Sequence, residues 1–189
     1  MFSATIPDGI KQIIKSHFSP NAHQIAIDKR KVVNKKIKHQ YVICDDVDKF
    51  HALQNFLKSV KGQTGIVFCK TKNATQKLEK QLTSKNFSVG SIHGDLKQIE
   101  RDKVMRGFKK GTIKFLVATD IAARGLDINN LAFVYHYQLP DKPEYYTHRS
   151  GRTARGGKDG LSISVVNTSE MKHIRFFAKM LNIHFDQIR

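Results

Sequence analysis

Residues 148–155 bring together the basic side chains of this sequence that are best suited to binding an anion. The run reads His-Arg-Ser-Gly-Arg-Thr-Ala-Arg and contains no acidic residue. If the segment is helical, His148, Arg152 and Arg155 lie at i, i+4 and i+7 and share one stripe of the helix surface. Like charges on one stripe repel, whereas guanidinium groups match phosphate oxygens bidentately. The run predicts a site for a polyanion or, equally well when taken alone, an ordinary solvated basic face.

The residues around this run predict where such a helix begins and ends. Asp141 and Pro143 upstream have the types preferred at an N-cap and at the first helical position. Gly156-Gly157 downstream are typical of a helix end. The sequence therefore predicts a helix between these signals.

Other groups that can bind phosphate or hydroxyl follow predicted strands along the chain. They are Lys70, Thr71, Gly94, Arg101, Thr119, Gly125 and Asp127. In open parallel sheets, ligands bind beyond the carboxyl ends of the strands, so these residues and the arginine run are expected to share one rim. Thr119 can offer a hydroxyl to a phosphate and Asp127 can accept from a ribose hydroxyl, although either could instead cap a helix. A helix cap is the favoured interpretation of Asp120, and plain turns are the alternative for the glycines.

Short β-branched runs alternate with amphipathic segments from about residue 40 to the end. The runs expected to be strands span 40–44, 65–69, 88–93, 113–119, 132–137 and 161–166. Several are apolar throughout, as expected for strands that are buried on both faces. Helical stripes of apolar residues fall within 47–60, 74–82, 99–108 and 171–181. This alternation predicts an α/β domain with an open, doubly wound parallel sheet and right-handed crossovers.

The character of the chain changes before residue 40. Ile10, Ile13 and Ile14 predict a short helix, and Ser19-Pro20-Asn21 predicts a break after it. Residues 29–38 are strongly basic. They predict an interdomain linker or arm that contacts phosphates, with a plain solvated linker slightly favoured.

The composition limits the chain to one domain or little more. Its 189 residues have a hydrophobic content of 40%, which is enough for a core, and a formal net charge of +17. That charge favours nucleic acid or anionic surfaces as partners. No apolar run could span a bilayer and no signal-peptide pattern opens the chain, so we expect a cytoplasmic protein without membrane contact. Cys44 and Cys69 are expected to be buried free thiols, and neither they nor the histidines predict a metal site.

The usual loop that holds a nucleoside triphosphate is not found in the sequence. The pattern G-x-x-x-x-G-K-[ST] does not occur, and Gly156-Gly157-Lys158-Asp159 fails at its last position. Asp45 and Asp46 follow a predicted strand, as a magnesium-binding carboxylate would, but are better explained as first-turn acids of the next helix. The chain therefore has arginines that could stabilise a triphosphate and no loop that could hold one alone.

In order along the chain, these segments resemble the C-terminal RecA-like domain of DEAD-box ATP-dependent RNA helicases, from Ser3 to about Asn182. The matching segments are Ser3-Ala4-Thr5 for the third motif, 66–71 for the fourth, His93-Gly94-Asp95 with Gln98 and Arg101 for the segment after it, 118–127 for the fifth and 148–155 for the sixth. Ser150 and Ala154 depart from the sixth motif, where the family often has an apolar residue and glycine. Neither departure removes a charged group.

The resemblance implies a role for each candidate residue. Arg152 and Arg155 would face the γ-phosphate of ATP, with Arg155 as the arginine finger. His148 would connect to motifs of the first domain, and Asp127 would contact the ribose in a nucleotide site that includes Gly125. The RNA backbone would be contacted by Lys70, Thr71, Gly94, Arg101 and Thr119. Contacts of this kind are largely independent of base sequence.

The resemblance also implies a partner domain. Residues 1–20 are expected to be the tail of an N-terminal RecA-like domain, 21–38 the basic interdomain linker and 39–189 the C-terminal RecA-like domain. ATP with Mg²⁺ would be held mainly by the missing N-terminal domain of the same protein, and this chain alone is expected to be inactive. The whole protein is expected to unwind RNA duplexes or remodel RNA–protein complexes. A related DNA helicase or translocase and a non-catalytic RNA-binding module are the alternatives.

Overall fold

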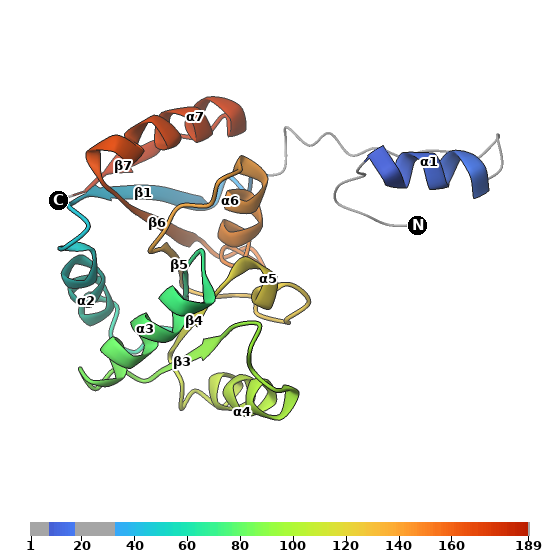
Figure 1. The fold of residues 1–189 in the computed structure, drawn as a ribbon. Helices are drawn as coiled ribbons and strands as arrows, with labels where there is room; N and C mark the ends of the chain where they lie inside the picture. Colours follow the sequence, from blue (N-terminus) through green and yellow to red (C-terminus); the bar gives the residue numbers. More distant parts are fainter. Residues whose placement is uncertain (1–7, 18–32, 189) are drawn as a thin grey trace.

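The computed structural model describes residues 8–17 and 33–188 (Figure 1). The Ser3-Ala4-Thr5 segment and most of the predicted linker lie outside the described residues. Helix α1, Asp8–His17, is the short helix that the isoleucines predict. Ile13 on this helix is 51% exposed.

The core of the fold is a seven-stranded sheet in which every neighbouring pair of strands is parallel. The strands are β1 Ile37–Ile43, β2 Gly65–Phe68, β3 Val89–Ile92, β4 Phe115–Ala118, β5 Phe133–His136, β6 Gly160–Val166 and β7 Phe185–Gln187. Their order across the sheet is β3-β4-β2-β5-β6-β1-β7. Each apolar run corresponds to a strand, and the predicted open parallel sheet is confirmed.

Two features of the sheet differ from the expected strands. Strand β1 begins at Ile37, so residues 37 and 38 of the basic segment already belong to the sheet. Strand β7 is not predicted by the sequence. It pairs with β1, with Phe185 opposite His39, and it is too short for an alternating pattern to show.

Helices cover both faces of this sheet (Figure 1). They are α2 Lys49–Ser59, α3 Lys72–Thr83, α4 Gln98–Lys109, α5 Asp120–Ala123, α6 Pro143–Ser150 and α7 Met171–Leu181, with a 3-10 turn at Thr168–Glu170. The helices that the stripes predict are confirmed, whereas α5, with only four residues, is not foreseen. No helix in the described part of the chain has the length and apolarity needed to cross a bilayer.

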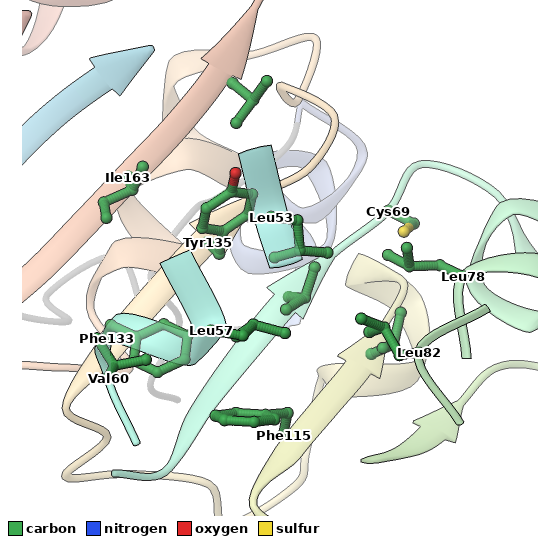
Figure 2. Close-up of a cluster of buried hydrophobic side chains, with 13 residues drawn as sticks. Leu53, Leu57, Val60, Cys69, Leu78, Leu82, Phe115, Phe133, Tyr135 and Ile163 are labelled. Carbon is green, nitrogen blue, oxygen red and sulfur yellow. The ribbon is translucent and has the colours of Figure 1, made fainter. Parts of the chain in front are cut away.

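Successive residues of one strand enter different cores, which explains why the strands are apolar throughout. Val67 packs with Leu53 of α2 and Leu78 of α3, in the cluster that Figure 2 shows. The next residue, Phe68, packs on the opposite face in the cluster that contains Ala122 of α5. Burying each such large side chain contributes about 1.5–3 kcal/mol to folding. The strands beneath the site are thus fixed from both faces.

Helix α6 does not begin as its upstream signals predict. Lys142 is the N-cap residue and Pro143 occupies the first helical turn. Asp141 is not the cap, because its carboxylate forms an ion pair with the ammonium of Lys70 at 2.6 Å instead. The predicted place of Pro143 in the first turn is confirmed, since the fixed φ of proline suits that turn.

Helix α6 also ends earlier than Gly156-Gly157 predict. Ser150 is its last residue, so Arg152 and Arg155 lie in the following turn and do not share a helical stripe with His148. That part of the prediction is wrong. The cause is tertiary: the Thr153 hydroxyl donates to the carbonyl of Leu131, and the two residues form an isolated β-bridge. Because of this pairing, the residues after Ser150 do not continue the helix.

The acids after β1 do not lie in the first turn of α2. That helix begins at Lys49, and Asp48 is its N-cap residue. Asp46 accepts from the ammonium of Lys49 at 2.9 Å, and this contact lowers the pKa of Asp46. Asp45 and Asp46 thus precede the helix, and Asp46 serves as a local partner of a buried lysine.

The cysteines are free thiols with different degrees of burial. Cys69 at the end of β2 is buried, and burial raises the pKa of its thiol to about 12. Cys44 is only half-buried, and burial is the main cause of its raised pKa. Since the thiolate is the reactive form, both groups are poor nucleophiles at neutral pH.

Candidate active site

The arginines of residues 148–155 differ sharply in environment. Arg149 is 1% exposed and forms a two-point ion pair with Asp120, Nε to Oδ1 and Nη2 to Oδ2, each at 2.6 Å. Its Nη1 donates to the carbonyl of Gln138 at 2.8 Å, and its guanidinium lies over the ring of Phe68. Arg149 is therefore fully occupied within the protein and joins α6 to α5.

The pairing with Asp120 corrects an expectation and identifies a residue that sequence reasoning misses. Thr119, not Asp120, is the N-cap residue of α5. Within an otherwise exposed-looking basic run, nothing local marks Arg149 as buried. The only available signal is its spacing of three residues from Tyr146, which places both on the inner side of α6, where both are fully buried.

Arg152 lies beside the loop that follows α5. Its Nη1 donates to the carbonyl of Leu126 at 3.1 Å, and its Nη2 lies 3.4 Å from the carbonyl of Ala123. Burial is the main cause of a lowered pKa of Arg152, and the charge of Arg155 adds to it. No carboxylate forms an ion pair with either arginine in residues 8–17 and 33–188. The site therefore holds neighbouring positive charges without a counter-charge, which favours an anion.

Arg155 is exposed, and its Nε donates to the carbonyl of Gly151 at 2.9 Å. The bond holds the guanidinium stem back against the end of α6, and the two terminal nitrogens have no hydrogen-bond partner among residues 8–17 and 33–188. An exposed guanidinium with free donors can bind two oxygens of a phosphate. Arg155 is the residue of the run that is best placed to contact a group outside this chain.

His148 borders a small pocket between α5 and α6. The pocket is lined by Phe68, Asp120, Ala123, Arg124, Tyr145, His148, Arg149 and Arg152 and has a volume of about 70 Å³. Arg124 lies over the ring of Tyr145 at 5.3 Å from its centroid. Small-molecule sites usually measure about 300–1,000 Å³, so this pocket alone can form only part of one.

Gly125 and Asp127 lie in the same loop whose carbonyl Arg152 contacts. Gly125 has φ +73°, and a Cβ at this position would meet no atom within 4 Å, so the backbone is open to close approach. Asp127 is exposed and accepts from Asn129 at 2.9 Å. Both residues line a groove of about 360 Å³ against α4. The structure thus brings together three of the residues predicted for the nucleotide, Gly125, Asp127 and Arg152.

The residues predicted for RNA gather at a different place, the carboxyl edge of β3, β4 and β2. These strands are neighbours in the sheet, so Gly94, Thr119 and Lys70 follow adjacent strand ends. Gly94 is exposed, with no atom within 4 Å of an added Cβ. Thr71 caps α3 by accepting from the amide of Ala74 at 3.2 Å.

Two of these residues carry structural contacts as well. The Thr119 hydroxyl accepts from the amide of Ala122 as the cap of α5, at the long distance of 3.4 Å, and Thr119 is 8% exposed. Arg101 of α4 donates from Nη2 to the carbonyl of Ala122 at 2.5 Å. Arg101 therefore lies behind α5 and holds it, rather than extending freely from the edge.

The expectation of a single rim is wrong for the arginines. Helix α6 starts after the carboxyl end of β5 and runs back, so Thr153 pairs with Leu131, which precedes β5. Arg152 consequently contacts the segment between α5 and β5, at the carbonyls of Ala123 and Leu126, and Arg155 follows it in the turn after α6. The predicted residues therefore lie in two places, the carboxyl edge of β3, β4 and β2 and the turn at residues 151–155 that carries Arg152 and Arg155, which we call the arginine turn.

A buried polar network supports α6 from below and is also missed by sequence reasoning. Nδ1 of His39 lies 2.8 Å from the Tyr146 hydroxyl, which lies 3.1 Å from the hydroxyl of Ser162. The Ser162 hydroxyl also contacts His136 at 3.1 Å and Ser150 at 2.9 Å. Burial lowers the pKa of His39 to about 4 and that of His136 well below its usual value. The network ties the middle and the C-terminal end of the helix, at Tyr146 and Ser150, to β1, β5 and β6.

No residues of the described chain suit a resident metal. Groups of three or more His, Cys, Asp or Glu side chains that could hold an ion do not occur among them. The exposed carboxylate of Asp127 and the unpaired arginines instead suit an organic anion with hydroxyl groups.

A comparison of the sequence with known families matches residues 48–157 to the helicase conserved C-terminal domain. A protein of Methanocaldococcus jannaschii named "Probable ATP-dependent RNA helicase MJ0669" is 40% identical over 189 residues, which is 100% of this chain and 50% of that protein. This chain therefore spans about half the length of the curated relative.

Solved structures of similar fold include DEAD-box proteins. The crystal structure of a DEAD box protein from the hyperthermophile Methanococcus jannaschii has 39% identity and a TM-score of 0.78, covering 100% of this chain and 50% of that chain. Saccharomyces cerevisiae Dbp5 bound to RNA and ADP BeF3 has 32% identity and a TM-score of 0.87, covering 99% and 50%. The C-terminal domain of Dbp5 has 32% identity and a TM-score of 0.75, covering 81% and 90%.

Proposed function

Because this chain belongs to the helicase conserved C-terminal domain family, in its DEAD-box branch, we propose that it supplies the C-terminal RecA-like half of an ATP-dependent RNA helicase. The whole protein would unwind RNA duplexes or remodel RNA–protein complexes. The observation that carries this proposal is the pair Arg152 and Arg155, whose charges have no carboxylate partner in the described chain. An ATP held by a second domain supplies the missing anion.

At the nucleotide, the arginine turn acts on charge that develops during phosphoryl transfer. Arg155 contacts the γ-phosphate as the arginine finger, and Arg152 contributes positive potential from its half-buried position. Asp127 accepts from a ribose hydroxyl beside Gly125. Mg²⁺, held mainly by the N-terminal domain, neutralises phosphate oxygens when bound. This chain completes that site and does not hold ATP by itself.

At the RNA, the carboxyl edge of β3, β4 and β2 contacts phosphates and sugars. Gly94 leaves space after β3 for close approach of the RNA backbone, and Lys70 and Thr71 offer charge and a hydroxyl after β2, two strands away. Thr119 offers its hydroxyl at the next strand end, and Arg101 supports this edge through α5. The relative Dbp5, which matches 99% of this chain, was solved with RNA and a nucleotide, and this supports both parts of the proposal.

Closure of the two domains couples these parts. His148 borders the pocket between α5 and α6 and faces outward, where it can contact the other domain and report closure. The ion pair of Arg149 with Asp120 couples a movement of α5, next to the RNA edge, to a movement of α6, which leads into the arginine turn. ATP and RNA together favour the closed state, and hydrolysis with product release reopens it.

The proposal that each domain supplies part of the ATP site can be tested by RNA-stimulated ATP hydrolysis. The assay compares this chain alone with this chain after its N-terminal domain has been added. We expect no turnover from the isolated chain and recovery when the second domain is supplied. Robust turnover by the isolated chain would contradict the proposal.

Matched RNA and DNA duplexes of one sequence separate the alternatives. The proposal predicts ATP-dependent unwinding of the RNA duplex only. Equal activity on DNA would instead indicate a DNA helicase or translocase. RNA binding that responds steeply to salt and not at all to nucleotide would indicate a non-catalytic binding module.

A further inference from the structure

The segment that leads into β1 is bonded directly to the turn that carries Arg155. Nδ2 of Asn34 donates to the carbonyl of Ala154 at 2.5 Å, across 120 positions of sequence. Oδ1 of Asn34 accepts from the amide of Lys36 at 3.0 Å. The Asn34 amide thus uses its donor and its acceptor at once, which neither alanine nor aspartate can do.

Further contacts from the same segment surround this turn. Nζ of Lys36 donates to the carbonyl of Gly157 at 2.5 Å, and the amide of Gly160 donates to the carbonyl of Lys36 at 3.0 Å. Residues 34–36 therefore hold the chain at 154, 157 and 160. Arg155 lies inside the span that these bonds enclose.

The backbone at Ala154 makes this support necessary. Ala154 has φ +56° and is 4% exposed. A left-handed conformation is disfavoured for a residue with a Cβ and persists where the surroundings fix it. On one side the Thr153 hydroxyl is bound to Leu131, and on the other the Ala154 carbonyl is bound to Asn34. The direction in which Arg155 leaves the turn depends on both contacts.

We infer that Asn34 is a positioning residue for Arg155, acting through the Ala154 carbonyl. This inference rests on the proposed function, in which Arg155 contacts the γ-phosphate and residues 21–38 link the two domains. A movement of the linker then reaches Ala154 and Arg155 through the hydrogen bond of Asn34, while Lys36 holds the chain two residues further on at Gly157. The basic segment has a conformational role in addition to any contact with phosphate.

The full-length protein with Asn34→Asp or Asn34→Ala tests this inference. Asn34→Asp keeps the acceptor for Lys36 and removes only the donor to Ala154. We expect either change to lower kcat for RNA-stimulated ATP hydrolysis about tenfold, the effect of one lost hydrogen bond, with KM for ATP and RNA affinity unchanged. Ala154→Gly in the Asn34→Ala background should restore part of kcat, because glycine adopts the positive φ unaided.

A second readout does not depend on the role of Arg155 in catalysis. Trypsin cleavage after Arg155, identified by mass spectrometry, should be about tenfold faster in both variants. Asn86→Ala is the matched control, since it makes the same substitution at an exposed asparagine that lies before β3, at the far edge of the sheet. We expect neither kcat nor cleavage after Arg155 to change in this control.

The outcomes separate this inference from the proposed function. Unchanged cleavage after Arg155, or unchanged kcat while Arg155→Ala abolishes turnover, overturns the positioning role of Asn34. Faster cleavage in the variants together with full turnover by Arg155→Ala contradicts the proposed function instead, and leaves the contact between Asn34 and the turn intact. A loss of kcat matched by an equal loss of folded protein in thermal unfolding would also overturn the inference.

Discussion

The buried Arg149 and the half-buried Asp120 form a two-point ion pair, with both nitrogen–oxygen distances at 2.6 Å. Arg149 shares its short basic run with Arg152 and Arg155, yet it faces inward while they have no carboxylate partner in the described chain. One arginine of the run thus belongs to the scaffold, and the other two remain available to a ligand. This division decides which substitutions affect stability and which affect activity.

The ion pair predicts a large loss of stability when one partner is removed. Asp120→Ala leaves the Arg149 guanidinium buried without its counter-charge, and we expect unfolding in urea to become easier by about 3–5 kcal/mol. Asp141→Asn is the matched control, because it breaks an ion pair of the same 2.6 Å length in which both side chains are substantially exposed. That change should cost about 0–1 kcal/mol. Equal losses for the two variants would contradict the distinction.

The polar network beneath α6 predicts a pH dependence of stability. His39 is neutral when folded, with its pKa lowered to about 4, and binds a proton when unfolded below about 6.5. The unfolded state therefore holds more protons between these values, so stability falls as pH decreases from about 6.5 to 4. His39 alone should contribute roughly 3 kcal/mol to this loss, and His136 acts in the same direction.

Urea unfolding of the chain across this pH range measures the effect. His39→Gln should flatten the dependence because it removes the titrating group. His51→Gln changes an exposed histidine of α2 and should leave the slope unaltered. A slope that survives His39→Gln in full would show that the acid sensitivity arises elsewhere.

The left-handed residue within the arginine turn predicts a stabilising substitution. Ala154 has φ +56°, a conformation that costs about 1–2 kcal/mol for a residue with a Cβ. Glycine avoids this cost, but it also increases the conformational entropy of the unfolded chain, which offsets part of the gain. We expect Ala154→Gly to raise the free energy of unfolding by about 0.5–1 kcal/mol. The same change in a helix, Ala52→Gly in α2, should lower it by about 1 kcal/mol. A destabilised Ala154→Gly protein would mean that the turn is not strained.

The sheet could be predicted well because its strands are buried on both faces. Val67 and Phe68 enter opposite cores, so the whole run is apolar and its length indicates a strand. Strand β7 carries no such signal. It exists because Phe185 packs against the ring of His39, a contact that only the folded chain creates.

The candidate site was predicted in its residue types and only partly in its geometry. Pro143 marks the start of α6 correctly, but the Thr153–Leu131 pairing that ends the helix is a contact between distant segments. For the same reason, sequence patterns could not show that Arg149 is buried while Arg152 is not. The two arginines belong to one run, and their environments differ only because distant segments of the folded chain pack against them. The nucleotide and RNA residues consequently occupy two places where one rim was expected.

Arg155→Ala in the full-length protein tests the central claim most directly, with Arg175→Ala on the exposed face of α7 as a control. The account predicts that Arg155→Ala lowers RNA-stimulated ATP hydrolysis by about a thousandfold or more, the usual effect of losing an arginine finger. RNA affinity should change little, and Arg175→Ala should retain full turnover. Near-normal hydrolysis by Arg155→Ala, or a loss of RNA affinity as large as the loss of turnover, would contradict the account.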